Sequence, residues 1–387
     1  MTGAEAGSDR VLIAGVSARA MAESTARAGY RVVAVDAFAD LDLRGIAQVI
    51  PLRQEYGTQF TAFAAAAAAR GVAAEAVAYT SNFENYPDAV DTLAAGHHLL
   101  GNRSAILRRV RDPLGLMRYL RRAGFATPRT RATPVSHREK GAWLLKPRRS
   151  GGGHGVTVWR RGQRVPRTHY LQERIKGMPG SVVFAADGRR AVLLGLSRQL
   201  MGDSHFAATG FRYCGSLIGP PPALFSDSEA LLEIATELIT AVTQEFGLVG
   251  VNGIDFIARD GVPYPLEVNP RYSASMELIE RAGALSIFEV HSQACQGRLP
   301  ARLPGMLRVE GKAIVFARQA VRMGQTRRWL DDSSVADVPH PGETISRSRP
   351  ICTVFARAKD AATCYKQLIR RAAAVYRTAR PVNGRAA

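Results

Sequence analysis

Apolar and polar positions in the first third of the chain follow strand and helix periods in turn, which predicts a β-α-β unit. Val11–Gly15 and Arg31–Val35 are short apolar runs, and the apolar residues between them, in Ala18–Ala28, recur at helical spacing. A further apolar run, Val77–Thr80, leads into the polar loop Ser81–Pro87. Because α/β sheets bind ligands at the carboxyl ends of their strands, we expect side chains of this loop near a binding site.

A second region starts where glycine and proline interrupt the helical pattern, at Gly124–Pro134. From Ala142 to Arg271, short apolar runs alternate with glycine-rich loops, and Ser228–Phe246 has the apolar spacing of one long helix. Two strand-like runs and a final helix are predicted after Gly305: Ala313–Ala317, Ile351–Arg357 and Ala361–Arg377. The pattern therefore predicts an α/β chain that is built from several units.

The chain has 387 residues, of which 46% are hydrophobic, and this is enough for two or three domains. Met1–Arg10 lacks a basic segment followed by an apolar run, so we expect no secretory signal and a cytoplasmic protein. Thr61–Ala78 is rich in alanine but contains Arg70 and Glu75, which favours a helix and a turn over a membrane span. The cysteines form no CxxC pair and are predicted to be reduced thiols: Cys214, Cys295, Cys352 and Cys364.

The formal net charge of +19 raises the hypothesis of a nucleic-acid partner, since the chain has 52 basic and 33 acidic residues. Many arginines lie within Arg103–Arg131, but apolar residues at helical spacing interrupt that segment, so its arginines can equally line a solvated helix face. The basic residues are mostly arginine, which is also typical of a biased nucleotide composition. We therefore disfavour nucleic acid as a partner and favour anionic small molecules.

The most informative motif places a lysine beside a flexible loop. Lys146 ends the apolar run that starts at Trp143, and a loop with Gly151, Gly152, Gly153 and Gly155 follows directly. Glycines let several backbone N–H groups approach phosphate oxygens, and lysine adds a compact positive charge. The loop lacks the Gly-Lys-Ser/Thr ending of a Walker A motif, and a purely structural glycine hairpin remains the alternative.

A second motif gathers oxygen ligands. Glu267 and Asn269 are two residues apart, so on a strand their side chains project from the same face. Asp255 can meet them from an adjacent antiparallel strand, since Asp260 and Gly261 supply a turn between the two. Two carboxylates and an amide oxygen suit Mg²⁺. The alternative is a polar strand face at a domain surface. Between the two motifs, Tyr170–Gly177 ends a strand in a short connection and is uninformative alone.

In this order the three elements resemble the ATP-grasp superfamily, and Val35–Arg44 is similar to the branch of ATP-dependent carboligases related to biotin carboxylase. The resemblance implies an α/β (α+β) fold with a Rossmann-like domain at 1–105, an ATP-grasp domain at 106–300 and a small β-rich C-terminal lobe at 301–387 that completes the grasp. The ATP-grasp domain would itself divide into two sub-domains, a glycine-rich lid at about 135–175 and a metal-binding part at about 176–300.

The resemblance also implies roles for single residues, with ATP and one or two Mg²⁺ as cofactors and Mn²⁺ as a substitute metal. The magnesium ligands would be Asp255, Glu267 and Asn269, and the catalytic cations would be Lys146 and Arg271. The residues implied to bind ATP are Lys146, Ser150, Gly151, Gly152 and Gly153 at the phosphates, and Gln172, Glu173, Arg174 and Ile175 at the adenine edge.

The sequence departs from the family pattern at three positions, and these departures restrict which ATP-grasp reaction is expected. Biotin carboxylases have a carboxylate base four residues beyond the arginine that matches Arg271, and here that position is Ser275. Biotin carboxylation is therefore disfavoured. Ser181 stands where related enzymes often have a glutamate near the ribose. The first phosphate-binding lysine of many relatives is also missing, and either Arg109 or Arg111 could substitute for it.

We therefore expect a ligase that forms an acyl phosphate from a carboxylate and ATP and then joins it to an amine, releasing ADP. The expected partners are a small-molecule carboxylate and an amine, with glutamate ligation in the biosynthesis of one-carbon cofactors of the tetrahydromethanopterin or methanofuran type as a narrower hypothesis. A homodimer is compatible with the resemblance. Two alternatives stay open: a non-catalytic ATP-binding regulatory protein, and a basic nucleic-acid-binding protein.

Overall fold

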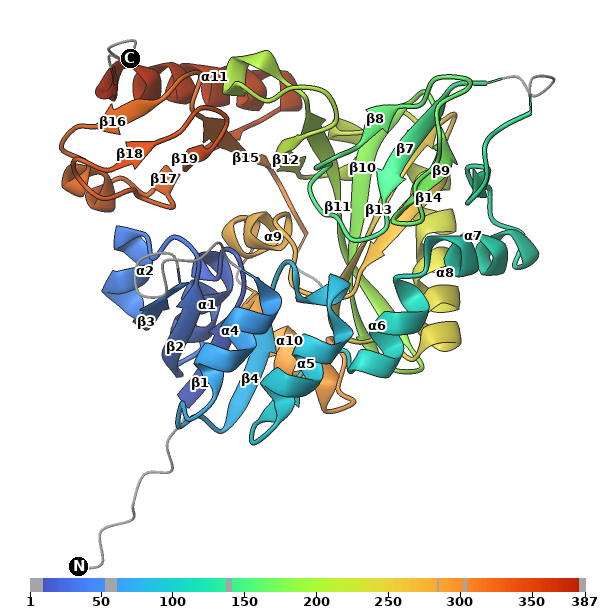
Figure 1. Ribbon diagram of the computed structural model, residues 1–387, viewed down its shortest axis with the longest axis horizontal. Coiled ribbons are helices and arrows are strands. Elements are labelled where there is room, and N and C mark those ends of the chain that lie inside the picture. Colours follow the sequence, from blue (N-terminus) through green and yellow to red (C-terminus); the bar gives the residue numbers. More distant parts are fainter. Residues whose placement is uncertain (1–9, 53–60, 137–140, 284, 302–304, 383–387) are drawn as a thin grey trace, which may run out of the picture.

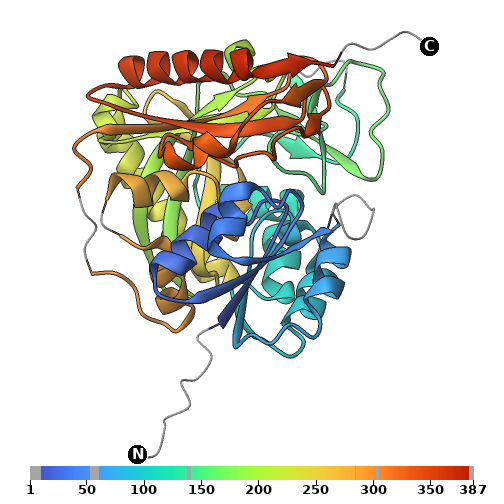
Figure 2. The same ribbon diagram turned by 90° about the vertical axis from the view of Figure 1, so that its left-hand side faces the viewer.

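The computed structural model describes residues 10–52, 61–136, 141–283, 285–301 and 305–382. In Figure 1 the N-terminal domain occupies one side of the molecule, a large sheet runs through the other side, and a small sheet lies at the edge of the large one. Seen from the side in Figure 2, the C-terminal helix lies across the large sheet, away from the N-terminal domain. None of the helices in the described ranges is both long and apolar enough to span a bilayer.

The N-terminal domain is a parallel sheet covered by helices, as the alternating pattern predicted. Its five strands are ordered β3-β2-β1-β4-β5. Most residues of β1, β2 and β4 are buried, which matches their continuous apolar runs and is typical of parallel strands that are covered on both faces. The strands are β1 (Arg10–Ala14), β2 (Arg31–Asp36), β3 (Gln48–Pro51), β4 (Ala76–Tyr79) and β5 (His98–Leu100). The helices are α1 (Arg19–Arg27), α2 (Leu41–Ile46), α4 (Ala62–Ala69), the 3₁₀ turn η1 (Phe83–Asn85) and α5 (Pro87–Ala94).

Two short helices, α6 (Ser104–Val110) and α7 (Pro113–Arg122), lead from this domain to the small sheet. Pro113 is the first residue of α7, and the Asp112 side chain accepts hydrogen bonds from the N–H groups of Leu114 and Gly115, so the sequence fixes where α7 begins. The small sheet has the order β6-β9-β7-β8. Its strands are β6 (Thr130–Arg131), β7 (Trp143–Pro147), β8 (Thr157–Val158) and β9 (His169–Glu173).

The large sheet is antiparallel and has the order β14-β13-β10-β11-β12-β15-β19-β17. Its strands are β10 (Met178–Asp187), β11 (Ala191–Met201), β12 (Tyr213–Ile218), β13 (Val249–Arg259), β14 (Val262–Asn269), β15 (Val309–Phe316), β17 (Val335–Ala336) and β19 (Pro350–Ala358). The sheet thus takes strands from both the expected metal-binding part and the expected C-terminal lobe. The expected metal-binding part and the expected C-terminal lobe are joined through the pairing of β12 with β15.

Alternating residues of β10 divide the core of this region into two layers. Val182 and Phe184 belong to the core that includes Leu238 of α8 (Ser228–Phe246). Val183 belongs to a second core with Phe288 of α10 (Ile287–Cys295) and with α1 of the N-terminal domain. Because successive side chains of a strand point to opposite faces, one strand is buried on both sides.

The remaining elements complete the C-terminal region. Helix α11 packs on β15 and β19 and confirms the predicted terminal helix. A three-stranded sheet has the order β18-β16-β20. The elements are α9 (Met276–Ala282), β16 (Val321–Met323), β18 (Thr344–Ile345), α11 (Ala361–Thr378) and β20 (Ala379–Pro381), with 3₁₀ turns at η2 (Ser204–Phe206), η3 (Pro221–Ala223) and η4 (Arg327–Asp331).

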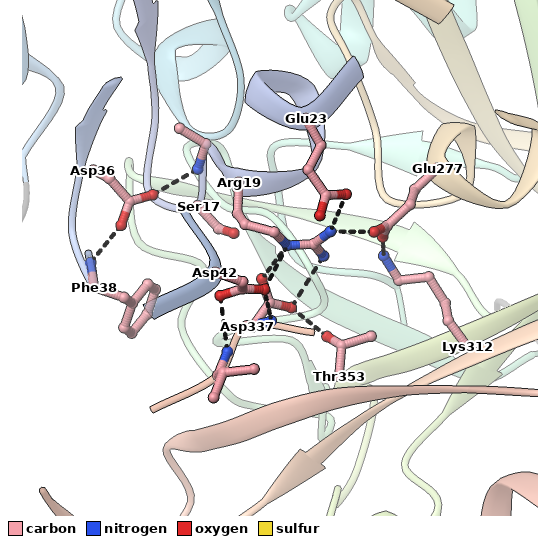
Figure 3. Close-up of polar contacts among 12 residues, drawn as sticks. Ser17, Arg19, Glu23, Asp36, Phe38, Asp42, Glu277, Lys312, Asp337 and Thr353 are labelled. Atoms are coloured by element: carbon pink, nitrogen blue, oxygen red, sulfur yellow. Dashed lines mark hydrogen bonds and ion pairs between the residues drawn. The ribbon is translucent and has the colours of Figure 1, made fainter. Parts of the chain in front are cut away.

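A buried ionic cluster connects the N-terminal domain, α9 and the C-terminal strands (Figure 3). Arg19 of α1 is only 2% exposed, and its guanidinium donates to Glu277 of α9 and, over 2.9 Å, to Asp337 Oδ1. Lys312 of β15 donates to the other oxygen of Glu277 over 2.6 Å. The Asp337 carboxylate also accepts from the Thr353 hydroxyl of β19. One arginine side chain therefore links three parts of the chain that are far apart in sequence.

Candidate active site

The predicted oxygen ligands come together at the hairpin of β13 and β14. Asp255 lies directly opposite Glu267 in the strand register, and Asn269 lies opposite Gly253. The Asn269 side-chain amide donates to Asp255 Oδ2 over 3.1 Å. The turn residues Asp260 and Gly261 both have positive φ, at 53° and 73°, which the sequence anticipated with its Asp-Gly pair. The geometric part of the prediction is confirmed.

The two carboxylates of this hairpin have different electrostatic environments. Burial, followed by repulsion from Glu267, raises the pKa of Asp255 to about 6. Burial also opposes ionisation of Glu267, but the charges of Arg111 and Lys146 outweigh burial and hold the pKa of Glu267 below its ordinary value. A bound cation would relieve the repulsion between the two groups.

The donor set fits a hard cation. Asp255 Oδ1 accepts from the Gln199 side chain over 2.9 Å, so this carboxylate is oriented from both sides. Within the ranges that the structure describes, no group of three or more His, Cys, Asp or Glu side chains forms a metal centre. The hairpin has two carboxylates and an amide oxygen, which is the sparse set that Mg²⁺ uses when phosphate oxygens and water supply the rest.

Lys146 is a residue of β7 in the small sheet, and its side chain interacts with the β13–β14 hairpin. Its Nζ donates to Gln172 Oε1 over 3.0 Å, and the Gln172 amide donates in turn to the carbonyl oxygen of Leu266 over 3.2 Å. Burial opposes the charge of Lys146, but the nearby Tyr170 and Glu267 outweigh it and raise the pKa of Lys146. The lysine is therefore a partly buried and permanent cation next to the carboxylate hairpin.

The glycine loop is held close to the large sheet by backbone contacts. The carbonyl oxygen of Gly152 accepts from the N–H of Tyr213 over 3.0 Å. Gly153 has a φ of 75°, and a Cβ atom there would lie 1.8 Å from the carbonyl oxygen of Phe211. Gly151 has no positive φ, and no atom lies within 4 Å of its Cβ position. The Ser150 hydroxyl donates to the carbonyl oxygen of His154 over 2.6 Å, which closes the loop on itself. Glycine at Gly153 is thus required by a close approach of two backbones.

The expected adenine segment forms the end of β9. The Gln172 side chain is buried and oriented toward Lys146, while Glu173 accepts from the Arg129 guanidinium on both oxygens. The Arg174 guanidinium lies 5.7 Å from the ring centroid of Phe211. Side chains of this segment are therefore engaged within the protein, and the prediction that the backbone through Ile175 contacts adenine stays a prediction.

Arg271 connects the hairpin to the N-terminal domain. Its NH2 group donates to Glu84 Oε1 over 2.7 Å and reaches Asn269 Oδ1 at 3.4 Å. Glu84 belongs to η1 and is completely buried. Burial opposes the charge of Arg271, but Glu84 outweighs it and raises the pKa of Arg271. A continuous chain of contacts therefore runs from Glu84 through Arg271 and Asn269 to Asp255.

The structure also distinguishes between Arg109 and Arg111, the two arginines that could replace the first phosphate-binding lysine of related enzymes. Arg109 is 56% exposed and forms an ion pair with Glu245 on α8. Arg111 is 11% exposed and points into the site, where NH1 donates to Glu267 Oε2 over 3.2 Å and NH2 donates to the carbonyl oxygen of Ser150 over 3.2 Å. Arg111 is therefore the one that reaches both the hairpin and the glycine loop.

Three residues that the sequence analysis did not name contribute to the site: Glu84, Asn85 and Gln199. Asn85 accepts from Arg111 and donates to the carbonyl oxygen of Ser150. Glu84 and Asn85 lie in the loop Ser81–Pro87, which the sequence placed near a ligand without assigning roles. Gln199 carries no local signal, because it is one of several polar residues on β11.

The positions that depart from the biotin carboxylase pattern have clear structural roles here. Ser275 is 5% exposed and lies at the N-terminal end of α9, where no carboxylate is available. The next carboxylate, Glu277, is held by Arg19 and Lys312 in the ionic cluster. Ser181 hydrogen-bonds to Asp255 and so supports the β13–β14 hairpin. No residue in these positions can act as the base of a biotin carboxylase.

Known protein families and structures resemble this chain in the region that contains the candidate site. The sequence profile of the ATP-grasp domain matches residues 110–275, which include Lys146, the glycine loop and the β13–β14 hairpin. An uncharacterised protein of Methanocaldococcus jannaschii is 28% identical over 123 residues, which is 31% of this chain and 30% of that protein. The aligned part thus spans about a third of that curated relative.

Solved structures share the fold along almost the whole chain. A biotin carboxylase from Campylobacter jejuni has a TM-score of 0.71 at 15% identity, covering 96% of this chain and 91% of that one. An L-amino acid ligase from Bacillus licheniformis has a TM-score of 0.66 at 14% identity, covering 95% and 97%. Residues 110–275 therefore match the ATP-grasp domain, and the fold of the chain as a whole resembles that of a biotin carboxylase.

Proposed function

We propose that the protein is a magnesium- and ATP-dependent ligase that activates a carboxylate and joins it to an amine, releasing ADP and phosphate. The observation that carries the proposal is the convergence of Lys146, Arg271 and the Asp255/Glu267/Asn269 hairpin in one partly buried site. The likeness to an L-amino acid ligase structure supports the amine as the acceptor. The loss of a carboxylate at Ser275 argues against carboxylation of biotin.

The residues of the chain have separable tasks in this reaction. Asp255, Glu267 and Asn269 would hold one or two Mg²⁺, with Mn²⁺ as a substitute, and the metal supplies charge neutralisation at the phosphates. Lys146 and Arg111, which both act on Glu267, would present positive charge to the phosphates. Arg271, which pairs with Glu84 of the N-terminal domain, would steady the acyl phosphate. Phosphoryl transfer needs such positioning more than it needs covalent chemistry.

The glycine loop excludes water. Ser150, Gly151, Gly152 and Gly153 would cover the phosphates, and the Ser150 carbonyl oxygen is held by both Asn85 and Arg111. An acyl phosphate hydrolyses in water, so a loop that covers it protects the intermediate until the amine reacts. The backbone of Gln172 to Ile175 is proposed to contact adenine.

The narrower substrate hypothesis is glutamate ligation in the biosynthesis of a one-carbon cofactor of the tetrahydromethanopterin or methanofuran type. The surplus of arginine supports an anionic substrate. A cytoplasmic location and a homodimer are part of the same proposal.

The decisive experiment measures ADP release from Mg-ATP with a panel of amino acids and acidic pterin or furan precursors, and follows products by mass spectrometry. We expect ADP release that depends on both a carboxylate and an amine, with a product mass equal to their sum minus one water. ATP binding without stimulation by any member of the panel would support the regulatory alternative instead. Binding to duplex DNA that falls steeply with salt would support the nucleic-acid alternative.

A further inference from the structure

Polar atoms without partners gather at the contact between η1 and the hairpin loop. Ten buried side-chain polar atoms lack a hydrogen-bond partner among the described residues, and half of them lie here. They are Asn82 Oδ1, Glu84 Oε2, Arg111 Nε, Arg271 Nε and Ser273 Oγ. A buried polar atom without a partner is costly, so five of them in one place indicate that a ligand completes the site.

The carboxylate of Glu84 is the least expected member of this group. Its side chain has no exposed surface, and only Oε1 is used, as the acceptor for Arg271. Both ATP and an acyl phosphate are anions, and a buried carboxylate beside Arg271 would repel them. The one reactant of the proposed ligation that carries positive charge is the amine, which is an ammonium ion in neutral water.

The Glu84–Arg271 pair also presents matched free groups. Arg271 keeps a free donor at Nε, and Glu84 keeps a free acceptor at Oε2. The free donor suits the anionic acyl phosphate, and the free acceptor suits the N–H groups of the amine. Because the two side chains are joined by a hydrogen bond of 2.7 Å, they would hold the electrophile and the nucleophile next to each other.

Asn82 adds a second acceptor. It directly precedes η1, two residues from Glu84, and its Oδ1 is buried and unpartnered. An acceptor that is not matched by a protein donor suits an N–H donor from a ligand. We infer that Glu84 and Asn82 form the subsite for the amine substrate and bind its ammonium group beside Arg271. This inference rests on the proposed ligase function and adds the residues that select the amine.

The test separates amine recognition from the activation step. Hydroxylamine is the probe nucleophile: it traps the acyl phosphate as a hydroxamate when supplied at high concentration, and it identifies the carboxylate substrate from the panel. The amine is then the panel member that raises ADP release with that carboxylate. For each variant, hydroxamate formation, KM for ATP and KM for the amine are measured.

Glu84→Gln is the first variant, because its amide oxygen can still accept from Arg271 while the free carboxylate oxygen is lost. We expect KM for the amine to rise about 10- to 100-fold, as for a lost hydrogen bond to a charged group, and hydroxamate formation to fall much less than ligation does. Asn82→Ala should raise KM for the amine about tenfold, and Asn82→Asp, which keeps an acceptor, should restore it. Glu75→Gln is the control, since Glu75 is exposed on the same domain.

Each other outcome has a separate meaning. If Glu84→Gln lowers hydroxamate formation as much as it lowers ligation, Glu84 only positions Arg271, and the inference is overturned while the ligase proposal stands. An unchanged KM for the amine in both Glu84→Gln and Asn82→Ala overturns it as well. If the wild-type protein forms neither hydroxamate nor amide with any panel member, the ligase proposal fails and the inference fails with it.

Discussion

Asp255 and Glu267 lie side by side, but their surroundings shift the pKa values of their carboxyl groups in opposite directions. Both carboxylates lie partly exposed on adjacent strands, yet partial burial and mutual repulsion raise the pKa of Asp255 to about 6, while Arg111 and Lys146 keep the pKa of Glu267 low. Glu267 thus stays charged over the whole neutral range, whereas Asp255 becomes protonated below about pH 6. This arrangement predicts that metal binding depends on both residues and on pH.

The first prediction concerns Glu267. Replacement by Gln removes the charge that faces Arg111 and the metal but keeps the shape of the side chain. We expect turnover to fall at least about a hundredfold with the far-UV circular dichroism spectrum unchanged. Glu233→Gln on the solvent side of α8 is the control and should retain full activity. Near-normal ADP release by Glu267→Gln would show that the metal site lies elsewhere.

The second prediction concerns pH. The protonated form of Asp255 cannot bind a cation, and its pKa in the folded protein is about 6. Mg²⁺ affinity should therefore be full well above about pH 6 and should fall up to about tenfold per pH unit below it. Isothermal titration with Mg²⁺ across this range measures the effect. The Asp255→Asn variant should bind Mg²⁺ more weakly and lose this pH dependence; a wild-type affinity that stays constant through pH 6 would contradict the assignment.

At the scale of elements, the site depends on how the small sheet is placed against the large one. Gly152 and Gly153 allow the loop after β7 to touch the strand β12 and the residues before it through backbone atoms alone. Arg111, in the connection between α6 and α7, holds the same loop from the other side through the Ser150 carbonyl oxygen. The position of the loop is thus set by elements that are not adjacent in sequence.

This placement predicts different effects for two neighbouring glycines. Gly153→Ala puts a Cβ atom 1.8 Å from the carbonyl oxygen of Phe211 at a residue with positive φ, so the loop must move away from the large sheet. We expect KM for ATP to rise about tenfold or more. Gly151→Ala is the matched control, because nothing lies within 4 Å of its Cβ position and its φ needs no glycine. Equal effects of the two variants would argue that the loop does not contact β12 during catalysis.

At the scale of the whole molecule, the N-terminal domain is attached to the rest of the chain on two sides. On one side Glu84 meets Arg271 in the active site. On the other side Arg19 meets Glu277 and Asp337, as Figure 3 shows. Arg19 and Lys312 outweigh the burial of Glu277 and hold its pKa far below the ordinary value. Its contribution to stability is therefore present above the ordinary glutamate pKa and is lost as the pH falls below it.

The ionic cluster gives a prediction for stability. Arg19→Met leaves Glu277 with Lys312 as its cationic partner and removes the arginine from Asp337, and removing one partner of a buried pair costs about 3–5 kcal/mol. We expect a lower midpoint of thermal unfolding, followed by circular dichroism. Arg19→Met combined with Glu277→Gln should recover part of the loss, because one buried charge is removed with its partner. The exposed Arg189→Met is the control, and a midpoint equal to wild type in Arg19→Met would contradict this role.

Local sequence patterns were enough to predict secondary-structure elements and the oxygen-ligand set of the candidate site. The helix Ser228–Phe246 was predicted with its observed ends, and the Asp255/Glu267/Asn269 set followed from a two-residue spacing and a short turn. Such features depend on backbone periodicity and on hairpins that close within a few residues, so neighbouring side chains suffice to specify them.

Which distant side chains complete the site depended on tertiary packing. It placed Arg111 rather than Arg109 beside Glu267, brought Glu84 to Arg271, and joined the C-terminal strands to the metal-binding sheet through β12 and β15. Glu84 and Arg271 are 187 residues apart. Contacts over such separations result from the packing of whole sheets and helices, and burial turns them into strong electrostatic interactions that no local sequence pattern records.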